Sequence, residues 1–157
     1  MTVYKAEGAR IVGDVSIGDE SSVWFNAVIR GDSDAIRIGN RVNIQDNCVI
    51  HCDKGFPVSI GNDVTVGHAA IIHGAVIEDN VLIGMGAIVM DGALIRKNSI
   101  VAAGALVTGN HEFEEGSLIL GNPAKTKRPL SESEIEYNRL SAEHYAALAK
   151  AELSAEE

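Results

Sequence analysis

The chain has 157 residues, of which 46% are hydrophobic and 22% charged, so one globular domain with a substantial core is expected. The formal net charge of −9 argues against nucleic acid or an anionic membrane as partner, and no apolar run reaches the roughly 18 residues of a membrane span. The N-terminus lacks the apolar segment of a signal peptide, so a cytoplasmic location is expected. Aromatic residues make up only 4%, so branched aliphatic residues must build the core.

An aliphatic residue recurs in steps of six along most of the chain. Every position of the series is Ile or Val: Ile11, Ile17, Val23, Ile29, Ile38, Ile44, Ile50, Ile60, Val66, Ile72, Ile77, Ile83, Val89, Ile95, Val101 and Val107. Small residues such as Ala27, Cys48 and Ala70 follow four places later. This is the hexapeptide repeat of a parallel β-helix, in which three hexads, about 18 residues, close one triangular coil. A period of six also excludes an amphipathic helix, which needs steps of three and four.

The register slips at three points. Three residues are inserted between Ile29 and Ile38, four are inserted between Ile50 and Ile60, and one is missing between Ile72 and Ile77. Inserted loops in repeat folds collect on binding faces. The second insertion contains Cys52, for which a structural role is the simpler interpretation.

After Val107 the repeat ends, and residues 108–129 are expected to be irregular. Ser131 and Glu134 have the spacing of a capping box, so a helix is expected from there to about Leu153. The predicted organisation is therefore a β-helix domain over residues 1–129 and a C-terminal helix over 130–157, packed on the β-helix or on a neighbouring subunit.

Stacking the coils places Arg30, His51 and His73 in one column, because each directly follows an inward aliphatic residue. The steps of 21 and 22 residues equal 18 plus the inserted three and four. Adjacent coils lie about 4.8 Å apart. At that spacing two imidazoles can converge on one metal ion with Zn–N bonds of about 2.0–2.1 Å.

His68 lies on the preceding corner of the triangle. The five residues to His73 span about 16 Å of extended chain, whereas two ligands of one tetrahedral ion lie roughly 3.3 Å apart. A cyclic trimer would bring His68 of one subunit to the His51/His73 column of the next, which gives a metal site at each interface. Asp46 lies one coil below His68, so Arg30 and Asp46 are predicted to pair across that interface. Gln45 would reach toward a metal-bound water.

These motifs resemble those of the γ-class carbonic anhydrases. The residues that carry the resemblance are Arg30-Gly31-Asp32, Asn43-Ile44-Gln45-Asp46, His51, Val66-Gly67-His68 and Ile72-His73-Gly74. It implies an all-β fold, a left-handed parallel β-helix of hexapeptide repeats with a C-terminal α-helix, that assembles as a homotrimer. It also implies Zn²⁺, or Fe²⁺ or Co²⁺, on His51, His68 and His73. Gln45 and Asn43 would orient the reacting water, and Arg30, Asp32 and Asp46 would form interface ion pairs.

The implied chemistry is the reversible hydration of CO₂ to bicarbonate. Three neutral imidazoles leave the charge of the ion intact and lower the pKa of a bound water to about 7. The chain departs from the best-characterised active members, which carry a glutamate-bearing loop after the first ligand as proton shuttle. The corresponding stretch here, residues 52–57, has no glutamate. A second shuttle position near Arg30, acidic in those members, is occupied here by Ser33, and Asp34 follows it. Tyr137 or Tyr145 of the helix could line the site.

Three other functions stay open at this level. Gly121-Asn122-Pro123-Ala124-Lys125 is also typical of hexapeptide acyltransferases, which need one catalytic histidine and no metal triad. A thioesterase-like enzyme that acts on acyl-CoA could share the metal site. The absent shuttle is also compatible with a non-catalytic, trimeric assembly protein.

Overall fold

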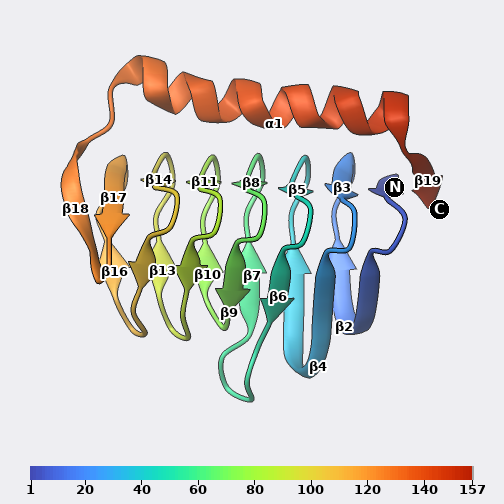
Figure 1. Cartoon of the computed structure of the whole chain (residues 1–157), viewed down its shortest axis with the longest axis horizontal. Helices are drawn as coiled ribbons and strands as arrows, with labels where there is room; N and C mark the ends of the chain where they lie inside the picture. The colour runs from blue at the N-terminus through green and yellow to red at the C-terminus, as the bar shows by residue number, and fades with distance from the viewer. Residues whose placement is uncertain (157) are drawn as a thin grey trace.

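The fold is a triangular parallel β-helix, as the computed structural model of the chain shows for residues 1–156 (Figure 1). Each coil contributes one short strand to each of three faces. Face 1 carries β1 (Val3–Lys5), β3 (Ser21–Val23), β5 (Asn43–Ile44), β8 (Thr65–Val66), β11 (Leu82–Ile83), β14 (Ile100–Val101) and β17 (Ser117–Gly121).

Two long strands, β2 (Arg10–Ile17) and β4 (Val28–Ile38), turn a corner and belong to both other faces. Face 2 continues through β6 (Val49–His51), β9 (Ile71–His73), β12 (Ile88–Val89) and β15 (Leu106–Val107). Face 3 continues through β7 (Val58–Ile60), β10 (Val76–Ile77), β13 (Leu94–Ile95) and β16 (Glu112–Phe113). All these strand pairs are parallel, so the repeat pattern correctly predicted the fold class.

The predicted aliphatic series forms the core. All its members are buried except Ile11 and Ile17, which lie in the first coil and pack against the core only in part. The ladder pairs match the predicted stacking, for example Ile29 with Ile50 and Ile50 with Ile72. Burying an aliphatic side chain stabilises a fold by about 1.5–3 kcal/mol, so each buried member of the series contributes on that order.

The expectation of irregular structure over residues 108–129 was wrong. Strands β16 and β17 continue the coil, with Phe113 above Ile95 and Ile119 above Val101, and both side chains are buried. The step of six thus persists beyond Val107, but a phenylalanine takes the first place. The chain then reverses into β18 (Ala124–Pro129), which pairs antiparallel with β17.

Helix α1 (Glu132–Glu152) lies along face 1, parallel to the long axis of the β-helix (Figure 1). The predicted capping box is present: Ser131 Oγ accepts from Glu134 N, and the Glu134 side chain accepts from Ser131 N. The buried Asn138 amide donates to the carbonyls of Asn80 and Ser99 and so ties the helix to the coils. After the helix, β19 (Ser154–Glu156) pairs antiparallel with β1. Within residues 1–156, no helix combines the length and the apolar character that crossing a bilayer requires.

Candidate metal centre

His51 and His73 occupy neighbouring positions at the ends of β6 and β9, as the spacing predicted. They form a ladder pair, and Arg30 pairs with His51 one coil below. His51 Nδ1 lies 3.1 Å from His73 Nε2. That separation is close to the roughly 3.3 Å between two ligands of one tetrahedral zinc ion. The two nitrogens therefore fit a shared metal ion.

Each of the three histidines forms a hydrogen bond to a carboxylate through one of its ring nitrogens. His51 Nε2 donates to Asp32 Oδ1 at 2.8 Å, and His68 Nδ1 donates to Asp46 Oδ2 at 2.7 Å. His73 Nδ1 donates to Asp91 Oδ1. A carboxylate that accepts the ring proton fixes the tautomer of a ligand histidine and directs the lone pair of the opposite nitrogen. The nitrogens left for a metal are thus His51 Nδ1, His73 Nε2 and His68 Nε2.

Arg30 forms an ion pair with Asp32 of the same chain. The hydrogen bond from His51, together with Arg30, holds the pKa of Asp32 below its usual range, so this carboxylate stays charged at neutral pH. Asp46 is engaged by His68 rather than by Arg30 within the chain. The predicted ion pair between Arg30 and Asp46 across an interface is a contact between two copies and stays a prediction.

His68 projects from the corner between faces 1 and 2. A side chain on Gly67 would lie 2.9 Å from Ile83 O and from Met85 N of the next coil, so only glycine fits directly before it. Ala69 after it has φ 58°, the left-handed conformation that turns this corner. The imidazole of His68 is about half exposed.

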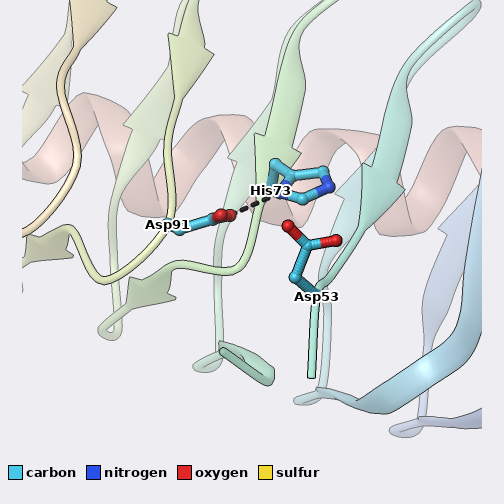
Figure 2. A group of neighbouring side chains, drawn as sticks. All are labelled: Asp53, His73 and Asp91. Atoms are coloured by element: carbon cyan, nitrogen blue, oxygen red, sulfur yellow. Dashed lines mark hydrogen bonds and ion pairs between the residues drawn. The ribbon is translucent and has the colours of Figure 1, made fainter. Parts of the chain in front are cut away.

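The three histidines do not converge within one chain. Among residues 1–156, the group of three or more potential ligands whose atoms lie within 4.8 Å of one another is Asp53, His73 and Asp91 (Figure 2). His68 is absent from it. This agrees with the reasoning that His68 serves a neighbouring subunit, although the assembly itself stays a prediction.

A chain of buried side chains orients Gln45. Gln45 Nε2 donates to Asn43 Oδ1 at 3.0 Å, and Asn43 Nδ2 donates to Thr65 Oγ1 at 2.9 Å. Thr65 Oγ1 lies 3.3 Å from Ser141 Oγ of the helix. Neither Thr65 nor Ser141 was predicted as a site residue. Thr65 is the ladder partner of Asn43 in the next coil, whereas Ser141 reaches Thr65 only through the packing of α1 on face 1.

A cavity of about 380 Å³ opens beside His68, between the corner of the coils and α1. Its lining includes Gln45, Met85, Tyr137 and Tyr145, so both tyrosines lie near His68, which the sequence could not decide. Tyr145 packs edge-on against Trp24, and burial raises the pKa of its phenol. Small-molecule sites range from about 300 to 1,000 Å³, so this cavity is large enough for a small organic molecule.

The insertion after His51 forms a short turn without a glutamate. Cys52 is buried, and its thiol donates to Asp34 O at 3.2 Å, which supports the structural interpretation of this cysteine. Asp53 is exposed beside His73 (Figure 2). Gly55 N donates to Asp34 Oδ2 at 2.8 Å, so Asp34 anchors the turn.

The comparisons with known proteins first identify the structural class of the protein. The chain matches the family models described as "Bacterial transferase hexapeptide (six repeats)" at residues 74–109 and "Hexapeptide repeat of succinyl-transferase" at residues 57–90. A solved hexapeptide transferase family protein from Anaplasma phagocytophilum superposes with a TM-score of 0.92 at 44% identity, covering 96% of this chain and 89% of that one. The chain is therefore a hexapeptide-repeat β-helix protein.

The sequence relatives narrow the class. "Gamma carbonic anhydrase 2, mitochondrial" of Arabidopsis thaliana is 44% identical over 154 residues, which cover 94% of this chain and 55% of that protein. "Probable carbonic anhydrase" of Methanocaldococcus jannaschii is 69% identical over 80 residues, 51% of this chain and 50% of that protein. The chain belongs to the γ-class carbonic anhydrase family of hexapeptide-repeat proteins. The matches to these two relatives span about half of their length.

Proposed function

We propose that the protein catalyses the reversible hydration of CO₂ to bicarbonate at a metal site shared between subunits of a homotrimer. The observation that carries the proposal is the 3.1 Å approach of His51 Nδ1 to His73 Nε2, with the outer nitrogen of each ring held by a carboxylate. Two imidazole lone pairs that face each other at this distance repel unless a proton or a cation lies between them. The donor set of three histidines favours Zn²⁺, with Fe²⁺ or Co²⁺ as alternatives.

The residues around the ion have separate tasks. His51, His73 and the partner subunit's His68 would hold it as neutral ligands, and zinc bound in this way supplies a Lewis acid that makes water reactive toward CO₂ at neutral pH. Gln45 is held by the hydrogen-bonded chain through Asn43 and Thr65, and its amide would orient a water on the ion. Asp32 keeps Arg30 and His51 in place.

An aliphatic ridge on face 2 supports the trimer. Outward side chains of five successive coils form it: Val28, Val49, Ile71, Ile88 and Leu106. Val49 and Ile88 are exposed although they are aliphatic. The ridge lies between the corner that carries His68 and the column that carries His51 and His73. Packing three ridges around an axis parallel to the coils would bury them and keep His68 near the height of His73.

Metal analysis combined with stopped-flow CO₂ hydration tests the proposal. The purified protein should hold about one zinc per subunit and should accelerate hydration, and His68→Ala should lose both properties while its circular dichroism is unchanged. His144→Ala, an exposed histidine of the helix, is the matched control and should behave as wild type. Protein that takes up no metal, or zinc-loaded protein without hydration activity, would refute the proposal.

The cavity beside His68 favours a second candidate, hydrolysis or transfer of a small acyl group. Its volume of about 380 Å³ lies within the range of sites for small organic molecules, about 300–1,000 Å³, so it offers room for a substrate larger than CO₂. Incubation of the zinc-loaded protein with short acyl thioesters, with release of the free thiol as readout, distinguishes this activity from hydration.

A further inference from the structure

Asp91 reaches His73 from the next coil, although nothing in the motifs marks it. It follows β12, and the coils stack so that Gly92 N donates to Gly74 O at 2.7 Å. The Asp91 carboxylate accepts a hydrogen bond from His73 Nδ1 (Figure 2). A side chain on Gly74 would lie 2.4 Å from Asp91 Oδ1. The glycine after His73 thus leaves the space through which the aspartate reaches the ring.

Asp53 is a second carboxylate beside the same ring, but its relation to His73 differs. It comes from the turn after β6 and is exposed, whereas the side chain of Asp91 is 32% exposed. Its carboxylate lies within 4.8 Å of the other two groups, but the hydrogen bond of His73 Nδ1 goes to Asp91. The two aspartates therefore form a matched pair for comparison. Both lie beside His73, but only Asp91 accepts the hydrogen bond from its Nδ1.

We infer that Asp91 is a positioning residue that holds His73 with its proton on Nδ1 and aims Nε2 at the metal. The inference rests on the proposed function, since it assigns a role within the same site. It completes a set in which Asp32, Asp46 and Asp91 each orient one ligand histidine. Because the ring can otherwise rotate or exchange tautomers, loss of the carboxylate should weaken metal binding without disturbing the coil.

The competing arrangement is a separate cation held by Asp53, His73 and Asp91 themselves. In that arrangement Nδ1 of His73 would be a ligand and would carry no proton, and Asp53 would matter as much as Asp91. The two arrangements therefore predict opposite protonation of His73 Nδ1. Only the competing arrangement predicts that Asp53 contributes to metal binding.

The experiment compares Asp91→Asn, Asp91→Ala and Asp53→Asn in the full-length protein. Zinc affinity is measured by competition with a chromophoric chelator, and thermal unfolding of the metal-free form checks the fold. Asp91→Asn, which keeps a weaker neutral acceptor, and Asp91→Ala should lower zinc affinity by about 10- to 100-fold, with Ala the more severe. Asp53→Asn should bind zinc as wild type does.

A second readout does not depend on bound metal. Nitrogen-15 NMR of histidine-labelled, metal-free protein reports which ring nitrogen of His73 carries the proton, and the wild type should show Nδ1–H. Unchanged zinc affinity in both Asp91 variants, an Nε2–H tautomer in the wild type, or an equal loss of affinity in Asp53→Asn would overturn the inference. If the wild type binds no zinc, the proposed function fails, whereas the tautomer still decides the role of Asp91.

Discussion

Two variants that are each unable to bind metal should restore metal sites when they assemble together. His51→Ala lacks a proposed ligand of the column, and His68→Ala lacks the proposed ligand of the opposite corner. If a site uses His51 and His73 of one subunit and His68 of the next, it is complete where a His68→Ala chain supplies the column and a His51→Ala chain supplies the corner. Neither homotrimer can form such a pair.

The expected yield follows from the arrangement of ligands. In randomly mixed trimers with equal amounts of both chains, the chain that supplies the column is the His68→Ala variant in half of the sites. The chain that supplies the corner is the His51→Ala variant in half of the sites, so ~25% of sites meet both conditions. A mixture of His51→Ala with His73→Ala is the control. The 3.1 Å contact places these two ligands in the same chain, so every site of that mixture lacks one and none is restored.

Co-refolding from denaturant, removal of loosely bound ions and zinc analysis per subunit measure this yield. The His51/His68 mixture should hold about a quarter of the wild-type zinc, and the His51/His73 mixture should hold only background. Equal recovery in both mixtures, or no recovery in either, would refute the assignment of ligands to chains.

Three further predictions concern the fold. Ile83 is fully buried in a central coil, so Ile83→Ala should lower the free energy of unfolding of metal-free protein by about 2–5 kcal/mol in urea titrations. Hydrogen bonds from Arg128 and Ser131 lower the pKa of Glu134 to about 2. The ionised form of Glu134 therefore stabilises the helix fully above the ordinary glutamate pKa of about 4.3. The difference in unfolding free energy between wild type and Glu134→Gln should vanish as the pH falls to about 2. A difference that does not change with pH would contradict this role of Glu134. Burial raises the pKa of the Cys48 thiol to about 11, so mass spectrometry should find it unalkylated in native protein at neutral pH and modified after unfolding.

The sequence predicted the register of the coils because a strict period leaves little choice. Once the insertions after Ile29 and Ile50 are counted, the positions of His51 and His73 follow by addition, and the structure pairs them as expected. The same arithmetic missed Phe113 and Ile119, since an aromatic residue interrupted the search for branched aliphatics.

The parts of the site that depend on side-chain direction could not be predicted. Asp91 is one of many acidic residues, and its place one coil above Gly74 is a signal only when the side chain is known to bend toward His73. Ser141 and Tyr145 join the site through the packing of α1, which no repeat specifies, whereas Thr65 stacks on Asn43 within the register of the coils. A period determines which residues stack, whereas rotamers and helix docking determine which of them meet.

The antiparallel strands β18 and β19 at the two ends of face 1 affect how the protein self-associates. A parallel coil accepts the next coil through hydrogen bonds that carry no sequence information, so a bare terminal coil would accept a coil of another molecule equally well. At one end β18 pairs antiparallel with β17, and at the other end β19 pairs antiparallel with β1, so each terminal parallel strand is covered by a strand of opposite direction. These short strands are therefore expected to limit linear polymerisation of the protein, and with it the formation of fibres.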